Sequence, residues 1–283
     1  MKKVNKIKIF STVIVLPLIA IFSIPAIAAG PTVTPGTTST FAVLAGTTIT
    51  NTGPTTIGGT AGGDVGLSPG SAFTGSSTVT ISGAQHLADA VAVTAQTDLV
   101  AAYNSVSAPT PTILATPELA SKVITPGTYS TTAGTFANSG ALTLDAQGDT
   151  TAIFIFQAAS TLITSAGSTM TLINGAQACN VYWRVGSSAT LGTNSTFVGR
   201  IFALTSITAE SGAAVRGQLL AQTGAVNLNA NVITNDACAV APPTPTPTPS
   251  ASTSPQSYDN SPTFFQQLNW IGGKITGWFA KLF

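Results

Sequence analysis

The sequence predicts a mainly β protein that folds as a solenoid of stacked coils, with one long helix beside it. Three observations support this fold class. Between Tyr182 and Asn235 the chain repeats with an eighteen-residue period, and the repeated columns are apolar, small or hydroxylated. Charged residues make up 7% of the chain, against roughly 25% in a typical soluble protein. Repeats of about 20 residues with glycine corners are typical of β-solenoids, whose coils bury side chains only against neighbouring coils.

A shift by one period brings similar residues into register. Trp183, Ile201 and Leu219 share one apolar column, which we expect to point into the core, and Gly199 falls over Gly217 at an expected corner. Three further columns hold small and hydroxylated residues that we expect mostly outside: Ser187, Thr205 and Thr223; Ser188, Ser206 and Gly224; Thr190, Thr208 and Val226. One face of the solenoid is therefore expected to have a regular pattern of side chains without charge.

An earlier copy of the repeat, from Phe156 to Met170, aligns with a longer offset of twenty-seven positions, which places Ser160 over Ser187. The extra nine residues indicate a loop inserted around Leu172 to Asn180. The stretch FAVLAGTTITNTG, which begins at Phe41, has an apolar start and a Thr-rich end. We therefore expect it to form another coil.

The N-terminus has the pattern of a secretory signal peptide, residues 1–28. Four lysines lie at the start of the chain, and an apolar run from Ile9 to Ile24 is followed by small residues up to Ala29, which predicts cleavage after Ala28. An uncleaved anchor is the alternative, but the apolar run is short for a bilayer span of about 20 residues. We expect a protein that is secreted, or exported and retained at the cell surface.

Removal of this segment leaves six basic and nine acidic residues, a net charge of −3. Nucleic acid is not expected as a partner of such a sparsely charged, slightly acidic surface. Residues 29–40 are rich in Pro, Thr and Gly, and we expect them to form a flexible leader. The folded domain is expected to span residues 41–241.

Export makes a disulfide between the two cysteines, Cys179 and Cys238, the favoured state. The bridge would close a loop of about 60 residues and contribute about 4 kcal/mol on the chain-entropy model. Two unpaired thiols are the alternative, because a disulfide requires Cβ atoms that lie close together in space.

The period changes between Gly83 and Val106, where few Gly or Pro occur. Apolar residues recur there at steps of three and four: Leu87, Val91, Ala95, Leu99 and Ala102. This spacing predicts one amphipathic helix. Because a helix of about 20 residues is marginal in water by itself, we expect its apolar stripe to pack along the coil stack.

After Cys238 the chain becomes a Pro-, Thr- and Ser-rich linker, residues 242–262, which we expect to be extended and semi-rigid. Residues 263–283 are then expected to form an amphipathic helix. Its polar residues exclude an ordinary transmembrane span, whereas Trp270, Trp278 and two lysines suit a helix in a membrane interface. The alternatives are a helix for docking or self-association, and a tail that becomes ordered only on contact. The apolar positions at helical spacing are Phe264, Leu268, Ile271, Ile275, Phe279 and Leu282.

The sequence offers no set of residues typical of catalysis or metal binding. His86 has no second His, Cys or carboxylate at a ligand spacing. Asp145 and Asp149 are expected to cap a turn beside Gly148, since sugar-cleaving and calcium sites need several converging carboxylates or cations. We therefore expect no enzyme activity, no metal and no cofactor.

Four segments together resemble the microbial ice-binding proteins of the DUF3494 type. The resemblance covers about residues 41–238 and implies a right-handed β-helix of triangular section, with one long helix along its side. It also implies that the N-terminal coil is inserted beside C-terminal coils. The segments are FAVLAGTTITNTGPTTIGGTAGGDVGLSPG from Phe41 to Gly70, TPGTYS from Thr125 to Ser130, LTLDAQGD from Leu142 to Asp149, and INGAQACNVYWRVGSSATLGTNSTFVG from Ile173 to Gly199.

The resemblance implies adsorption to an ice crystal surface through a flat Thr/Ser-rich face. The T-A/G-x-T/N pattern of the family is approached by Thr205-Ser206-Ile207-Thr208, whereas Thr223-Gly224-Ala225-Val226 departs from it at the end. The alternative is a non-enzymatic adhesion or structural module that binds polysaccharide or protein, which an aromatic-lined groove would favour. The residues expected to contact ice are Thr48, Thr161, Ser187, Ser188, Thr190, Thr205, Ser206, Thr208, Thr223 and Asn227.

Overall fold

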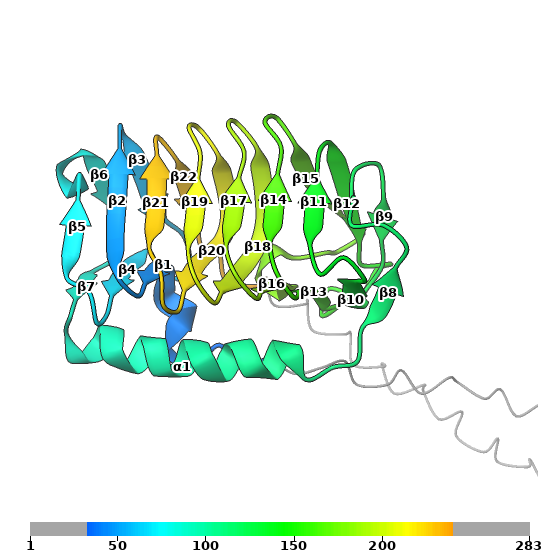
Figure 1. The fold of residues 1–283 in the computed structure, drawn as a ribbon, viewed down its shortest axis with the longest axis horizontal. Helices are drawn as coiled ribbons and strands as arrows, with labels where there is room; N and C mark the ends of the chain where they lie inside the picture. Colours follow the sequence, from blue (N-terminus) through cyan, green and yellow to red (C-terminus); the bar gives the residue numbers. More distant parts are fainter. Residues whose placement is uncertain (1–32, 240–283) are drawn as a thin grey trace, which may run out of the picture. The chain divides into compact units, whose positions relative to one another are not determined.

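The computed structural model describes residues 33–239 and confirms a mainly β stack of coils with one helix alongside (Figure 1). The chain divides into two units, Met1–Val240 and Ala241–Phe283, and the described residues belong to the first. The expected signal peptide (residues 1–28), the start of the leader, the linker (242–262) and the C-terminal helix (263–283) lie outside the described residues.

The described strands pair in parallel and form three faces around one core. The helix face contains β8 (Thr112–Leu114), β10 (Gly127–Thr131), β13 (Phe154–Ala158), β16 (Val181–Val185), the second halves of β18 (Thr196–Ala203) and β20 (Ala214–Ala221), β1 (Phe41–Ala45), β4 (Asp64–Leu67) and β7 (Gln85–Leu87).

The seven-strand face contains, in spatial order, β11 (Phe136–Asn138), β14 (Leu162–Thr164), β17 (Ala189–Leu191), β19 (Ile207–Ala209), β21 (Val226–Asn229), β2 (Thr48–Thr52) and β5 (Ala72–Thr74). The third face contains β9 (Val123–Ile124), β12 (Ala141–Asp145), β15 (Thr169–Ile173), the first halves of β18 and β20, β22 (Val232–Thr234), β3 (Thr55–Gly58) and β6 (Val79–Ile81). Three short 3₁₀ helices, η1 (Gly36–Thr40), η2 (Ser76–Thr78) and η3 (Ala178–Asn180), lie between these elements.

The columns expected in the core are buried in the structure. Trp183, Ile201 and Leu219 are each at most 1% exposed, and the Trp183 ring stacks on Phe156 at 4.0 Å between centroids. The buried Trp183 Nε1–H donates to the Val198 carbonyl at 2.9 Å, so burial of the indole leaves no unpaired donor.

The expected glycine corner is where β18 and β20 turn from the third face into the helix face. Gly199 and Gly217 are paired and have φ of 113° and 151°, a region that L side chains rarely adopt. A Cβ at Gly217 would overlap the carbonyl of Gly199. Coils can therefore stack at this corner only if it is free of side chains.

Stacking order differs from chain order, as the resemblance implies. The N-terminal coil β1–β2–β3 pairs with β20, β21 and β22, and β4, β5 and β6 stack beyond it. Helix α1 (Ala90–Ser107) then carries the chain back along the stack towards β8 (Figure 1). At 1.5 Å per residue its 18 residues span about 27 Å, or roughly six strand spacings.

The predicted start of the helix at Gly83 is wrong. Residues Gln85–Leu87 form β7 and pair with β4, so their backbone groups are used by the sheet. The helix begins after Asp89, whose carboxylate accepts from the Ala92 N–H at 2.9 Å. Leu87 and Val91, which the spacing placed in the apolar stripe, are 37% and 46% exposed. The buried stripe is instead Ala92, Ala95, Leu99, Ala102, Tyr103 and Val106.

The expectation of a flexible leader is wrong for its C-terminal part. Residues Gly36–Thr40 form η1. The Asp98 carboxylate of α1 accepts from both the N–H and the hydroxyl of Thr37 at 2.7 Å, and Gln218 donates to the Thr38 carbonyl at 2.7 Å. These contacts with two distant elements fix the segment, although its composition is typical of a loop.

The inserted loop and the disulfide are present. Phe156 pairs with Trp183, as the longer offset predicts, and the extra residues form the turn after β15 and η3. Cys179, in η3, is bonded to Cys238 with a Cα–Cα distance of 5.5 Å. The bridge ties the chain after the last strand to this loop.

Candidate functional site

The seven-strand face is a parallel sheet without charge. None of the residues in its seven strands is charged or titratable. Side chains alternate between the core and the outside, so each short strand offers one to three outward side chains. In Figure 1 these strands stand side by side in front, from β5 to β11, with α1 running below them. The outward rows therefore form ladders with one rung for each coil.

The central ladder runs across all seven strands. Neighbouring rungs are separated by the strand spacing of about 4.8 Å, and none of the side chains is buried. The two rungs at the β11 end are apolar, and Ile163 is 51% exposed. The rungs are Ala137, Ile163, Thr190, Thr208, Asn227, Thr50 and Thr74.

A second ladder lies two residues earlier in the same register. It has small or hydroxylated side chains, and again none is buried. The two ladders are separated along the strand by two residues, about 6.6 Å. The second ladder is Thr135, Thr161, Ser188, Ser206, Ala225, Thr48 and Ala72.

The structure thus brings seven of the ten sequence-predicted residues into these two ladders. Thr190, Thr208 and Asn227 belong to the central ladder, and Thr161, Ser188, Ser206 and Thr48 belong to the second ladder.

The other three residues, Ser187, Thr205 and Thr223, lie at the turn between the helix face and the seven-strand face. Thr205 donates to the Ser187 hydroxyl at 3.4 Å, and Thr223 donates to the Leu204 carbonyl at 2.6 Å. They form the edge of the face and are accessible to solvent.

Hydrogen bonds between neighbouring coils restrain several of these side chains. Ser188 donates to the Thr205 hydroxyl at 3.3 Å, and Asn227 Nδ2 donates to the Thr208 hydroxyl at 3.4 Å. The Ser206 hydroxyl accepts from the Ala225 N–H at 3.1 Å. The face is therefore ordered before any ligand reaches it.

The constant period of the sequence gives the wrong neighbour for Thr208. A shift by one period placed Val226 beside it, yet Val226 is fully buried and Thr208 pairs with Asn227. The turn after β20 is one residue longer than the turn after β18. The chain from Val226 to Val232 is then one residue shorter than the paired stretch from Ile207 to Ala214. With this register, Gly224-Ala225-Val226-Asn227 ends in an outward Asn, as the T-A/G-x-T/N pattern requires, and departs from the pattern at its first position, where Gly224 replaces Thr.

Sequence reasoning missed part of the face at its β2–β5 end. Thr50 and Thr74 belong to the central ladder, and Thr52 is exposed at the end of β2. A signal for two of them was present, because Thr48, Thr50 and Thr52 alternate along a strand-like segment. Thr74 carried no such signal, since its coil lacks the period of the later coils.

The other two faces are interrupted. Helix α1 covers the helix face, where Arg200 is only 6% exposed and lies over the Tyr182 ring; burial lowers the pKa of its guanidinium. The third face carries Asp145 and Arg216, and η3 packs against β18 and β20 there. It therefore offers no continuous uncharged plane.

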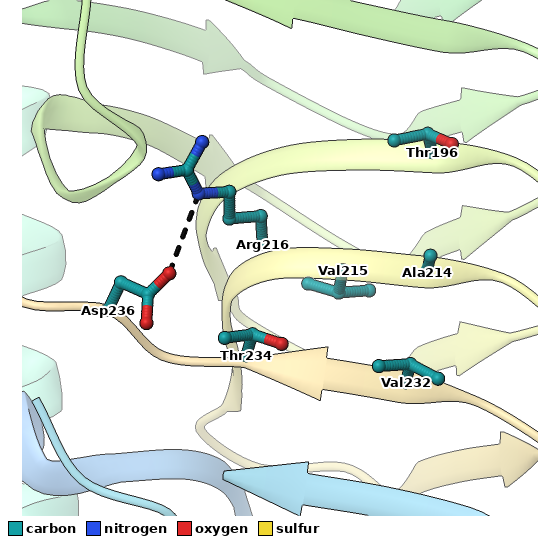
Figure 2. A pocket seen from close by; sticks show the side chains of 7 residues that line it. All are labelled: Thr196, Ala214, Val215, Arg216, Val232, Thr234 and Asp236. Atoms are coloured by element: carbon teal, nitrogen blue, oxygen red, sulfur yellow. Dashed lines mark ion pairs between the residues drawn. The ribbon is translucent and has the colours of Figure 1, made fainter. Parts of the chain in front are cut away.

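The third face has a shallow depression of about 170 Å³ beside the Arg216–Asp236 ion pair (Figure 2). Its floor is mostly apolar, and Val232 is 52% exposed. The guanidinium lies 3.5 Å from the Asp236 carboxylate, so the only charges at the depression compensate one another.

The carboxylates that the sequence singles out have structural partners. The Asp145 and Asp149 carboxylates accept from the N–H groups of Gln147 and Thr151 at 2.8 Å, as expected for turn caps. His86 lies in β7, with Nδ1 2.8 Å from Asp89. Among residues 33–239 no group of three potential metal ligands converges, no aromatic side chain is among the exposed large apolar residues, and no helix is long and apolar enough to cross a membrane.

Comparisons with known proteins agree with this geometry. A family model described as Ice-binding-like matches residues 43–234. The Ice-binding protein of Nostoc sp. (strain HG1) is 43% identical over 213 residues, which cover 73% of this chain and 75% of that protein. Ice-binding protein 1 of Shewanella frigidimarina is 42% identical over 144 residues, which cover 49% of this chain but 16% of that protein. The crystal structure of an ice binding protein from an Antarctic Biological Consortium has 41% identity and a TM-score of 0.68, and the match covers 71% of this chain and 90% of that chain.

Proposed function

This chain belongs to the ice-binding-like protein family, and we propose that it adsorbs to ice through the seven-strand face. The observation that carries this proposal is the pair of uncharged ladders that run along the stack, with hydroxyl, amide and methyl groups at a regular spacing. No other face of the described residues combines regularity, exposure and absence of charge.

The chemistry of the ladders suits a solid made of water. A Thr hydroxyl donates one hydrogen bond and accepts two, while its methyl group and stiff χ1 keep it in few orientations. Water molecules on such a surface are held at fixed positions without the strong hydration shell of an ion. Because the backbone and several side chains are already ordered, little conformational entropy is lost on binding.

Many weak contacts then act together over a rigid plane. A single exposed hydrogen bond contributes only about 1 kcal/mol, so the ladders must act as a set. The apolar rungs Ala137 and Ile163 extend the plane beyond its polar part without adding charge. Growth of the crystal is blocked where the protein remains adsorbed.

The test is to measure thermal hysteresis and ice recrystallisation inhibition on the purified protein, and to image the adsorption of a fluorescently labelled sample to a single ice crystal. We expect concentration-dependent activity and labelling of defined crystal planes. A well-folded sample that neither labels ice nor slows recrystallisation would contradict the proposal.

We further propose that the chain is exported and that residues 263–283 hold it at a membrane surface or on a second copy. The support is the charge and apolar pattern of residues 1–28 and the Trp- and Lys-containing apolar pattern of the C-terminal segment. Co-sedimentation with lipid vesicles, set against sedimentation velocity without lipid, separates the two locations. A protein that stays monomeric and does not bind vesicles would exclude both.

A further inference from the structure

After β22 the chain leaves the sheet and runs over the third face as a short segment, Asn235–Ala239, here called the C-terminal strap. Its start is bound to the loop after β3. The Asn235 N–H donates to Gly58 at 2.7 Å and its carbonyl accepts from Ala61 at 3.0 Å, while the Ala237 N–H donates to the Thr60 hydroxyl at 3.0 Å. One end of the strap is thus fixed to the N-terminal coil.

The middle and far end of the strap are fixed to other coils. Asp236 pairs with Arg216 of β20 (Figure 2), and Cys238 is bonded to Cys179 in η3. The side-chain amide of Gln177 both accepts from the Ala239 N–H at 2.6 Å and donates to its carbonyl at 3.2 Å.

The strap therefore connects parts of the stack that do not touch one another. Along the third face the order is β3, β22, β20, β18, β15, and the strap reaches from the loop after β3 to the loop after β15. In a solenoid each coil contacts only its neighbours, so stability is normally a sum of local terms. A covalent link across several coils adds a coupling that the sheets lack.

We propose that the strap is a redox-sensitive latch that holds the N-terminal coil and β21–β22 in the stack. Two-electron reduction by a dithiol converts the Cys179–Cys238 disulfide into two thiols, while the dithiol becomes a disulfide. Cys238 is exposed and can be reached by such a reductant. The Arg216–Asp236 pair is partly exposed and too weak to replace the bond.

The latch bears on the proposed ice-binding face, and to that extent it depends on the proposed function. Asn227, Thr50 and Thr74 form the β21–β2–β5 end of the central ladder. Opening of the latch loosens β22 and the N-terminal coil, so that end of the ladder loses its fixed spacing. The β11 end of the ladder, in the coil β10–β11–β12 to which the strap has no bond, keeps its order.

The test is amide hydrogen exchange, followed by mass spectrometry, on the full chain before and after reduction with dithiothreitol. We expect amides of β22 and β3 to exchange at least about tenfold faster after reduction, and those of β10 and β12, which lie away from both ends of the strap, to be unchanged. Uniform acceleration in all strands would mean that the disulfide acts only by restricting the unfolded chain, and would overturn the latch. No acceleration would overturn it as well.

Two variants make the result specific. In the double variant Cys179→Ser with Cys238→Ser, the same amides should exchange fast without reductant and should not respond to it. Gln177→Ala keeps the disulfide and should accelerate amide exchange in β22 less than reduction does. An equal acceleration would mean that the Gln177 contacts, and not the disulfide, hold the strap.

Thermal hysteresis of the oxidised and reduced protein then tests the link to the face. A lower value after reduction is expected, and local opening with unchanged thermal hysteresis would overturn the link. If neither form is active on ice, the proposed function is contradicted. The exchange data still show whether the disulfide holds β22 and the N-terminal coil in the stack.

Discussion

Thr208 lies at the centre of the seven-strand face, with Thr190 and Asn227 as its neighbours in the central ladder. Its side chain points outward between two buried residues of β19. A change at this position therefore alters the surface and leaves the core as it is. The consequences of such a change report on the face alone.

We expect Thr208→Tyr to lose most of the thermal hysteresis, because the ring protrudes from the plane and holds neighbouring rungs away from ice. The free energy of unfolding should change by less than about 0.5 kcal/mol, as measured by thermal or denaturant unfolding. Thr169→Tyr is the matched control, since Thr169 is an exposed, outward Thr on the third face. Full activity of a folded Thr208→Tyr protein would remove the seven-strand face as the ice-binding surface.

The register around β21 can be tested in the same way. Val226 is fully buried, so Val226→Asn should destabilise the protein by about 2–4 kcal/mol because the amide would lack hydrogen-bond partners. Asn227→Val should leave stability within about 0.5 kcal/mol and reduce thermal hysteresis. Equal destabilisation by both substitutions, measured by urea unfolding, would contradict the register.

At this scale the sequence predicted most of the face but not its register. The residues of regular coils, such as Ser188 and Thr190, could be assigned because a constant period keeps each column on one side. Val226 was misplaced because an added residue in one turn was compensated by a missing residue in the next, so the overall period stayed the same. Alternation within β21 was the signal that could have shown it.

At the scale of the secondary-structure elements, α1 depends on a tertiary contact. Its buried side chains join Leu44, Phe202 and Leu220 in a second apolar cluster outside the coils, and its outer side exposes valines. Leu99 is fully buried there, whereas Val100 is 45% exposed. Leu99 and Val100 are both aliphatic, so they differ mainly in how far their side chains are buried.

Leu99→Ala should therefore reduce the free energy of unfolding by about 2–5 kcal/mol. Val100→Ala, its matched control, should change it by less than about 0.5 kcal/mol. Urea unfolding followed by circular dichroism gives both values. Similar effects of the two substitutions would mean that the helix does not pack on the stack as described.

Two carboxylates, one at the start and one in the middle of α1, make the stability of this element depend on pH. The backbone N–H of Ala92 and the side chain of His86 lower the pKa of Asp89, and the backbone N–H and hydroxyl of Thr37 lower the pKa of Asp98, both from an ordinary value of 3.8. A lowered folded-state pKa gives stability that is complete above pH 3.8 and is lost as the pH falls through the folded-state pKa.

We thus expect the melting temperature to fall below about pH 4, and to fall less steeply in Asp98→Asn. Thermal hysteresis should stay constant with pH as long as the protein is folded, because the strands of the seven-strand face have no titratable side chain. Activity that changes between pH 5 and pH 8 in a folded sample would place a titrating group in the ice-binding site.

The helix could be predicted from its period, but its beginning could not. Leu87 continues the helical spacing although it lies in β7, because short strands and helices share apolar spacings over a few residues. These residues form a strand and not a helix because the backbone of Gln85–Leu87 pairs with β4. Likewise, the order of η1 comes from Asp98 and Gln218, which are distant in the sequence.

For the whole molecule, we expect the folded unit alone to be sufficient for ice binding. Residues 30–241 should have the same thermal hysteresis per mole as the protein with its C-terminal segment, since all rungs of both ladders lie within residues 48–227. Loss of activity in a well-folded truncated sample would mean that residues 242–283 contribute by clustering copies.

The order of the coils is the part of the fold that the period could not predict. A shift by one period relates successive coils only, and β1 gives no local sign that it pairs with β20. That arrangement was expected from the resemblance to a family and not from any pattern in the residues.

The position of the N-terminal coil determines when the stack of coils can be fully assembled. Among the described strands Phe41–Ala45 is synthesised first, yet its neighbour in the stack, Ala214–Ala221, is followed by only two more strands. The stack therefore stays open until nearly the whole domain has been synthesised, and contacts so far apart in sequence form slowly. A stack that closes this late fits the proposed export, because the chain can be threaded through a membrane before its N-terminal coil is paired.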